Sequence, residues 1–406
     1  MTGNTETASA KELTAESASR MDDGIFRRSR ALAEEIAAFL ENHGTPCKIT
    51  FPERFPLIVS EKGKVILPLG ICAESQERAS EIRKMAENVI SEQFGSKDAE
   101  DASGNARPII LAEDRWRGRE GECIRQRLLA HFGIFRHVFA RNCEVRRIRK
   151  DIAREFLDAY HSYGHTVCRY SYGLFLKKAA GTLVAVATFS NGRLMPRNGK
   201  VYRSYQWIRY ASLPDVRVSG GMGKMLKYFI SDMGMGREER HDGNEPENFG
   251  GCDIMSYADL EWSGGDVYRQ LGFIAEDRKS PVMYSISPAG GWQRVPVSRM
   301  NLQENPDGNS GTAVQHLPRS GNLYFENFGS TRYRLVIPEQ NCQCGICGQT
   351  TFLDADAGKR KFLRMFVTVF KRPYDEETFL HRLDNEGGIP DEKDCGSAHQ
   401  RTRQKV

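Results

Sequence analysis

The sequence predicts an α+β protein, with a mixed sheet flanked by helices, and two observations carry this prediction. Segments with the 3.6-residue apolar spacing of amphipathic helices alternate with short runs rich in β-branched and aromatic residues. Glycine residues end or join several of these segments, as at Gly44, Gly63 and Gly181. The chain has 406 residues, which is enough for two or three domains with separate cores.

The first part of the chain predicts a small α/β domain over residues 21–113. Residues 1–20 are rich in Ser, Thr, Ala and Glu and are expected to be disordered. The apolar stripe of the first helix ends at Gly44, a typical helix stop. The elements expected here are a helix over Ile25–His43, strands over Phe55–Val59 and Lys64–Leu69, a helix over about Ser75–Phe94 and a strand over Pro108–Leu111.

Residues 151–297 predict a second domain, joined to the first by a basic connector over residues 114–150. The expected order is helix, hairpin, strand, glycine turn, helix, strand, helix and strand. These elements fall at Asp151–Tyr160, Tyr172–Leu176, Leu183–Phe189, Tyr202–Tyr210, Met222–Met233, Asp253–Tyr257, Val267–Leu271 and Val282–Ile286.

The end of the chain predicts a linker, a module and a tail. Residues 298–321 are rich in Pro, Gly and Asn, residues 322–371 form a small β module, and residues 372–406 are a polar tail. The module holds the spacing Cys342-x-Cys344-x-x-Cys347, and zinc would need a fourth ligand such as Cys395, His381 or His399. The alternative is a set of ordinary reduced cysteines, and any zinc here is expected to be structural.

The sequence shows neither a secretory signal nor a membrane-spanning segment. The residues Met1–Thr7 carry neither the basic nor the apolar run of a secretory signal. No apolar stretch approaches the roughly 20 residues that span a membrane. We therefore expect a cytoplasmic protein without a membrane partner, in which the ten cysteines are reduced.

A basic segment runs from Arg115 to Arg154, with 12 Lys or Arg against 4 Asp or Glu and with interspersed aromatic residues. Such a segment is typical of contact with nucleic-acid phosphates, and DNA is the expected partner. A solvated, arginine-rich helix face has the same composition and remains the alternative. The candidate contacts in this segment are Arg141, Arg146 and Arg147.

The stretch Val218–Leu226 places glycines between a strand and an amphipathic helix. Glycine lets the backbone approach a ligand, and the unpaired N–H groups of a first helical turn favour an anion. The pyrophosphate of coenzyme A is an anion that suits such a turn. Close packing of the helix against the sheet is the alternative explanation for the same glycines.

The order of elements, this turn and the closing stretch Val267–Phe273 resemble the N-acetyltransferase (GNAT) fold. The resemblance implies that the turn binds the pyrophosphate of an acyl-CoA donor, and that a tyrosine before the last strand is a general acid. The residues implied in donor binding are Arg217, Gly220, Gly221, Gly223 and Lys224.

A second resemblance covers about Pro108 to Leu335. Phage and mobile-element proteins, often described as homing-nuclease-like, carry segments similar to Ile109–Trp116, Phe139–Glu144, Phe156–Gly164, Leu183–Phe189, Trp207–Tyr210, Gly220–Phe229 and Ser256–Asp259. Their GNAT-like part is similar to Mom, a phage enzyme that alters the exocyclic amine of adenine. Their N-terminal region commonly holds a nuclease. Here Glu61, Lys62 and Lys64 lie in an expected turn, so the N-terminal domain is expected to be a degenerate, nuclease-like remnant or a docking module.

The resemblance to Mom implies four catalytic residues: His161, Arg209, Asp259 and Tyr268. A histidine relays protons near neutral pH, an arginine binds a carboxylate or phosphate, and an aspartate accepts a proton from an amine. Each residue alone has an ordinary structural explanation as a cap, a local ion pair or a core side chain. Aromatic residues that could stack on an unstacked base, or pack in the core, are Trp207 and Trp262, with Tyr170, Tyr172 and Tyr205.

The two resemblances together imply a GNAT-fold group transferase of phage or mobile-element origin that modifies an exocyclic amine of a DNA base, with adenine favoured. One alternative is a non-catalytic DNA-binding or accessory module of a homing-nuclease-like protein. A second alternative is an acyl-CoA N-acetyltransferase that acts on a protein or a small amine.

Overall fold

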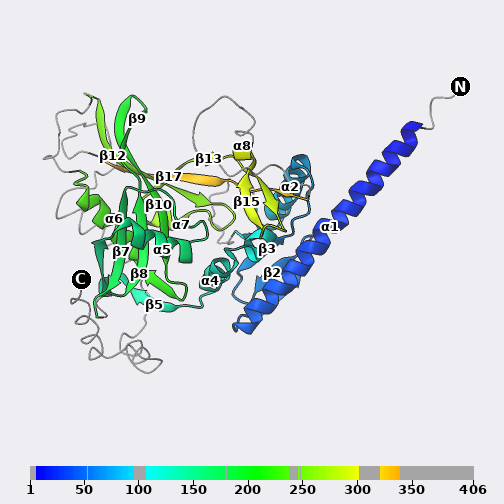
Figure 1. The fold of residues 1–406 in the computed structure, drawn as a ribbon, viewed down its shortest axis with the longest axis horizontal. Helices are drawn as coiled ribbons and strands as arrows, with labels where there is room; N and C mark the ends of the chain where they lie inside the picture. Colours follow the sequence, from blue (N-terminus) through cyan, green and yellow to red (C-terminus); the bar gives the residue numbers. More distant parts are fainter. Residues whose placement is uncertain are drawn as a thin grey trace, which may run out of the picture. The chain divides into compact units, whose positions relative to one another are not determined.

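The computed structural model describes residues 6–52, 54–95, 107–178, 181–236, 246, 248–300 and 321–338, with side chains from residue 24 onward except at residues 299 and 300. All of them belong to one compact unit, Met1–Asn341. The unit combines helices with parallel and antiparallel strand pairs, so the predicted α+β class is confirmed (Figure 1).

The first sheet has four strands in the order β1-β2-β3-β4, and a helix covers each of its faces. Ile58, Ile66 and Leu111 pack with Leu32 and Ile36 of α1 on one face. The alternate residues of the strands face α2 on the other side, as period-two strand geometry requires. These elements are β1 (Cys47–Thr50), β2 (Leu57–Ser60), β3 (Val65–Leu69), β4 (Ile109–Ala112), α1 (Glu6–Asn42) and α2 (Gln76–Phe94).

The expectation of disorder over residues 1–20 is wrong for the described part, because helix α1 begins at Glu6 and runs unbroken to Asn42. Figure 1 shows this helix, in blue, as a single rod. The stretch Glu6–Arg20 is rich in Ala and Glu, which have high helix propensity. The composition that predicted disorder, which has few apolar residues, therefore also favours a helix.

The second sheet has a seven-strand path, β13-β17-β12-β10-β8-β7-β6, with β9 paired to β10. Its strands are β6 (Cys143–Arg147), β7 (Tyr170–Leu176), β8 (Leu183–Phe189), β9 (Arg193–Arg197), β10 (Lys200–Ser212), β12 (Phe249–Asp259), β13 (Ile274–Lys279) and β17 (Ser330–Ile337). Helix α5 (Lys150–Tyr160) packs Phe156 and Leu157 against Val186 of β8. Helix α6 (Gly221–Asp232) stacks Phe229 on Phe189, with 3.9 Å between ring centroids. Since Val186 and Phe189 point to opposite sides of β8, the two helices cover opposite faces of the sheet.

The central strands β10 and β12 are parallel neighbours that pair over only part of their length. Their ladder runs from Val201 and Phe249 to Gln206 and Met255. Past that point β10 continues in the ladder with β8, and β12 continues in the ladder with β17. A register shift between Trp207 and Arg209 marks the change in β10. The facing edges of the two strands therefore separate toward their carboxyl ends.

The structure corrects the expected domain limits. Strand β17 lies between β12 and β13, so residues 330–337 complete the second sheet and are not part of a separate module. The rest of the proposed module and the tail lie outside the described residues. Residues 114–150 are not a simple connector, because they contain α3 (Glu113–Arg117), α4 (Gly121–His131), β5 (Arg136–Phe139), the 3-10 helix η1 (Ala140–Asn142) and β6.

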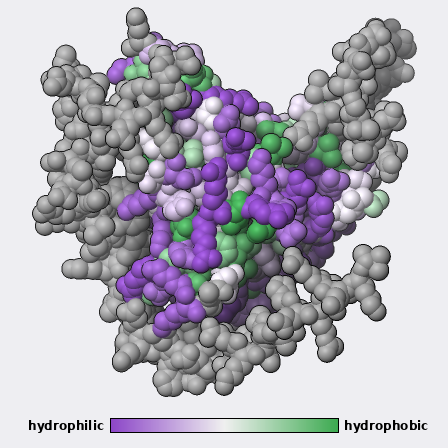
Figure 2. All heavy atoms as spheres, turned by 60° about the vertical axis from the view of Figure 1, so that its left-hand side comes forward, coloured by the Kyte–Doolittle hydropathy of each residue, from purple (hydrophilic) through white to green (hydrophobic). Residues whose placement is uncertain are grey.

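The remaining elements join the two sheets. Strand β11 (Val216–Ser219) pairs with β5, and α7 (Asp266–Gln270) follows β12. A small sheet contains β14 (Met283–Ser287), β15 (Gln293–Pro296) and β16 (Leu323–Glu326), and α8 (Val297–Met300) follows β15. The face in Figure 2 shows small apolar areas bordered by hydrophilic residues rather than one broad apolar surface.

Candidate functional site

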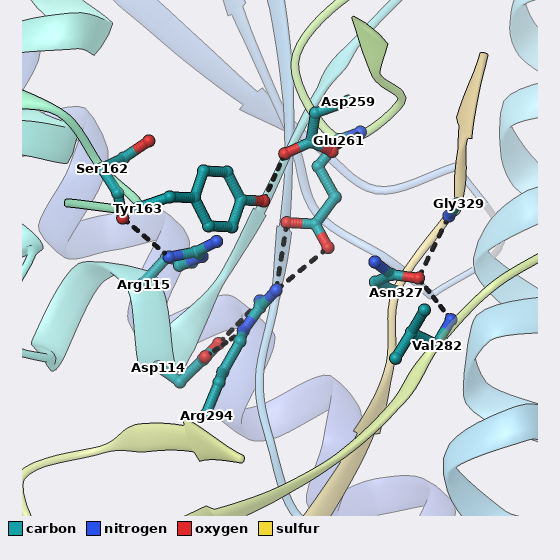
Figure 3. Close-up of polar contacts among 10 residues, drawn as sticks. All are labelled: Asp114, Arg115, Ser162, Tyr163, Asp259, Glu261, Val282, Arg294, Asn327 and Gly329. Carbon is teal, nitrogen blue, oxygen red and sulfur yellow. Dashed lines mark hydrogen bonds and ion pairs between the residues drawn. The ribbon is translucent and has the colours of Figure 1, made fainter. Parts of the chain in front are cut away.

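The segment His161–Gly164, which follows helix α5, bridges the separation between β10 and β12. On the β10 side, Arg209 Nε donates a hydrogen bond of 3.2 Å to the carbonyl of Gly164. On the β12 side, the hydroxyl of Tyr163 donates a hydrogen bond of 2.6 Å to Asp259 Oδ2 (Figure 3). The fold thus gathers three of the four predicted catalytic residues, His161, Arg209 and Asp259, around one short segment.

Tyr163 belongs to the candidate site by its contact with Asp259, and the sequence analysis missed it. Burial of its hydroxyl, together with the adjacent Asp259, raises its pKa above the ordinary value for tyrosine, so the phenol stays protonated. The residue as a whole nevertheless remains 42 % exposed. The second oxygen of Asp259 accepts the backbone N–H of Glu261 at 3.0 Å, which fixes the carboxylate. The available signal was position, since Tyr163 lies two residues after His161 in the segment that resembles phage proteins.

The geometry of His161 differs from the predicted proton relay. Its Nδ1 accepts the backbone N–H of Tyr163 at 3.0 Å, which assigns the ring proton to Nε2. Burial, followed by the nearby Arg209, Arg127 and Arg115, lowers the pKa of His161 to about 3. In this conformation the neutral imidazole offers a hydrogen-bond donor rather than a base.

Tyr268, the fourth predicted catalytic residue, lies where the two strands begin to separate. Its hydroxyl shares a hydrogen bond of 2.8 Å with the hydroxyl of Ser256 in β12, which is 3.2 Å from the carbonyl of Trp207 in β10. Its ring stacks on Tyr333, with 5.3 Å between centroids. Burial raises the pKa of Tyr268, so the phenol carries its proton at neutral pH.

The two tryptophans predicted as base-stacking surfaces are core residues. Trp207 and Trp262 are 3 % and 4 % exposed, so that expectation is wrong for the side chains as they lie. The indole N–H of Trp207 donates to the carbonyl of Arg209 at 3.1 Å. Trp262 stacks on His131, and the guanidinium of Arg127 lies 4.1 Å from the centroid of the Trp262 ring. Burial of a large aromatic ring stabilises a fold, and this explains why both side chains lie in the core.

The three predicted DNA-contacting arginines lie exposed on or beside β6. The Arg141 guanidinium lies 4.8 Å from the centroid of the Phe139 ring. Arg146 pairs with Glu144 on the same strand, and Arg147 lies 5.3 Å from the centroid of Tyr170. Their exposure leaves contact with a polyanion open as a prediction.

The glycine turn before α6 has the backbone geometry of an anion site. Gly220 adopts a left-handed conformation with φ of 73°, and no side chain caps the helix. A Cβ at Gly221 would lie 2.9 Å from the Tyr210 hydroxyl, so only glycine fits this approach of the turn to β10. Gly223, two residues further into the helix, is buried. The first turn of the helix therefore has N–H groups without a side-chain cap, an arrangement that favours anions in general.

Two basic residues, Lys224 and Arg217, were predicted to bind the donor at this turn. The ammonium of Lys224 donates to the carbonyls of Ala140, at 2.7 Å, and Cys143, so it holds η1 against α6. Arg217 is exposed and lies over the ring of Phe135. Lys224 is thus a structural residue in this conformation, and Arg217 keeps an exposed charge next to the turn.

A buried ionic cluster lies directly behind the site. Arg294 of β15 donates to Asp114 of α3 at 3.0 Å and to Glu261, just past β12, at 3.2 Å (Figure 3). The exposed fractions of the three side chains are 8 %, 1 % and 1 %. Burial raises the pKa of Glu261 to about 7, although Arg294 opposes this shift.

The predicted zinc ligands Cys342, Cys344 and Cys347 lie outside the described residues. Within the described part of the chain, no group of three His, Cys, Asp or Glu side chains is arranged to hold a metal ion. No helix there is long and apolar enough to cross a membrane.

Comparison with known proteins assigns the chain to no class. No protein-family model matches it, and no curated protein is detectably similar to it in sequence.

Proposed function

We propose that the chain is a GNAT-like group transferase that modifies an exocyclic amine of a DNA base, with adenine favoured. The observation that carries this proposal is the separation of β10 and β12, with Asp259, Arg209 and the segment His161–Gly164 gathered at the opening. Ligands of open α/β sheets bind beyond the carboxyl ends of parallel strands, where neighbouring strands diverge. The uncapped turn at Gly220 begins the helix that connects the same two strands, so a donor phosphate would lie on the path to this opening.

The residues at the opening suit transfer of an acyl group to an amine. As the new N–C bond forms, Asp259 accepts the proton that the amine nitrogen loses. As the bond from the carbonyl carbon to the thioester sulfur breaks, Tyr268 donates its phenolic proton to the leaving thiolate. Tyr163, which donates to Asp259, holds that carboxylate in place. A base in duplex DNA must be unstacked to reach Asp259. Tyr163, a partly exposed aromatic residue beside this carboxylate, is the candidate to stack on it.

The test is nucleoside mass spectrometry of DNA from cells that express the intact chain. We expect a new nucleoside whose added mass identifies the transferred group, and its loss with Asp259→Asn. The matched control is Asp151→Asn, which changes an exposed aspartate at the start of α5 and should leave the new nucleoside unchanged. A nucleoside profile identical to that of cells without the protein would contradict the proposal, as would full modification by Asp259→Asn.

A second candidate is an acyl-CoA N-acetyltransferase that acts on a protein or a small amine, which the uncapped turn at Gly220 equally favours. Incubation of the purified chain with acetyl-CoA and candidate amines separates the two, because free thiol is then released without DNA. The third candidate, a DNA-binding accessory module, is favoured by the exposed Arg146 and Arg147. It predicts DNA binding with neither a new nucleoside nor thiol release.

A further inference from the structure

Three arginines from three different elements converge on the segment His161–Gly164. Arg115 of α3 donates to the carbonyl of Ser162 at 3.2 Å (Figure 3). Arg127 of α4 lies 3.5 Å from the hydroxyl of the same serine, and Arg209 of β10 donates to the carbonyl of Gly164. Each guanidinium is thus held by neutral oxygen atoms of one short segment.

These three cations lack carboxylate partners. Among the described residues, no Asp or Glu oxygen lies within ion-pair distance of Arg115, Arg127 or Arg209, and Nε of Arg115 has no hydrogen-bond partner. Arg294, by contrast, forms ion pairs with two buried carboxylates, those of Asp114 and Glu261. Partly buried cations are normally paired, because burial without a counter-charge is costly.

The surrounding groups show the same excess of positive charge. Two acidic groups lie at the segment: Asp259, which already accepts the Tyr163 hydroxyl, and Asp158, whose Oδ1 accepts the backbone N–H of His165 at 2.8 Å. Burial, followed by the three arginines, lowers the pKa of His161, so that the imidazole stays neutral and adds no further charge. An anion that approaches the partly exposed Tyr163 would therefore meet an attractive potential rather than a neutral one.

We propose that Arg127 and Arg209, with the more deeply buried Arg115 behind them, bind a phosphodiester group of a nucleic-acid strand. A guanidinium is a planar fork that matches phosphate oxygens, and a tetrahedral phosphate presents oxygens to groups arriving from several directions. Bound there, the phosphate would fix the strand while the neighbouring nucleotide reaches Tyr163 and Asp259. The inference rests on the proposed function only for the choice of nucleic acid as the source of the phosphate.

The test measures binding of a short, fluorescein-labelled single-stranded oligonucleotide to the full chain by anisotropy at several salt concentrations. We expect Arg127→Gln and Arg209→Gln each to weaken binding about tenfold. Each should also reduce the slope of log affinity against log salt by about 0.7, the value for one lost phosphate contact on a single strand. Arg127→Lys should keep the slope while it loses affinity, because it retains the charge without the fork.

The matched control is Arg119→Gln, whose side chain is 89 % exposed just before α4 and which should bind like the wild type. An oligonucleotide with neutral methylphosphonate linkages should bind weakly to all variants alike. Wild-type affinity and slope in both Gln variants would overturn the inference, as would arginine-dependent binding of inorganic pyrophosphate or coenzyme A without oligonucleotide binding. Arginine-dependent oligonucleotide binding without a modified nucleoside would retain this site and reject the transferase.

Discussion

His131 and His161 show how single residues at the site depend on their surroundings. Burial, together with neighbouring arginines, lowers the pKa of each imidazole to about 3. A histidine in an unfolded chain titrates near 6.5. Between these two pH values the unfolded chain binds protons that the folded protein excludes, so acid favours unfolding.

We therefore predict that each of these histidines makes the free energy of unfolding fall as the pH drops from about 6.5 to 4. The slope should be at most about 1 kcal/mol per pH unit for each, since both rings are partly exposed. Glu261 has the opposite effect, because its raised pKa makes the folded protein bind the extra proton between about 4.5 and 7. The difference in the free energy of unfolding between wild type and His131→Asn, followed across this pH range, isolates the contribution of His131.

The measurement is urea unfolding across this pH range, with the exposed His43→Asn as the control. The wild-type curve should lose stability faster toward low pH than the curve of His131→Asn, and His43→Asn should follow the wild type. Parallel curves for wild type and His131→Asn would show that His131 is not held neutral by burial.

At the scale of elements, the parallel strands β10 and β12 and the connecting helix α6 create the site together. The two strands pair only as far as Gln206 and Met255, which leaves room for a bridging segment. Helix α6 begins at a glycine turn that lies against Tyr210 of β10, so the turn and the opening belong to one structural unit.

Gly221→Ala is predicted to destabilise this unit. The added Cβ would lie 2.9 Å from the hydroxyl of Tyr210 and 3.0 Å from the Cβ of Val218, so the turn must move. We expect a loss of about 1–3 kcal/mol in the free energy of unfolding, typical of overpacking. Gly24→Ala in α1 is the control, because nothing lies within 4 Å of its Cβ position. Alanine there should be neutral or stabilising by up to about 1 kcal/mol. Equal stability of the two variants in urea unfolding would contradict the packing argument.

At the scale of the whole unit, the cluster of Asp114, Glu261 and Arg294 ties the first sheet to the second and to the small sheet. Asp114 follows β4, Glu261 follows β12 and Arg294 lies in β15. A single arginine therefore satisfies two buried carboxylates from different sheets.

Removing the cation should uncouple these parts. Arg294→Met leaves two buried carboxylates without a counter-charge, and we expect a loss of about 3–5 kcal/mol in the free energy of unfolding. Arg119→Met, at an exposed position, should change it by less than about 0.5 kcal/mol. The measurement is urea unfolding followed by circular dichroism, and a loss below about 1 kcal/mol for Arg294→Met would show that water reaches the carboxylates.

The sequence by itself determined the elements whose signals are local. Strand β8 was expected at Leu183–Phe189 and lies there, and helices α2, α5 and α6 lie within one or two residues of their expected bounds. Apolar periodicity and glycine turns act between near neighbours, so they can be recognised without knowledge of the fold. His161 and Asp259 were identified through short segments of the same local kind.

The tertiary structure alone decided which distant parts meet. It placed β17 between β12 and β13, and it buried Trp207 and Trp262, which local sequence had offered as surfaces. It also brought Arg115 and Arg127, from two helices far away in the chain, to the segment that holds Tyr163. Strand order, burial and unpaired charge depend on contacts between residues far apart in the chain, and such contacts leave no periodic trace in the sequence.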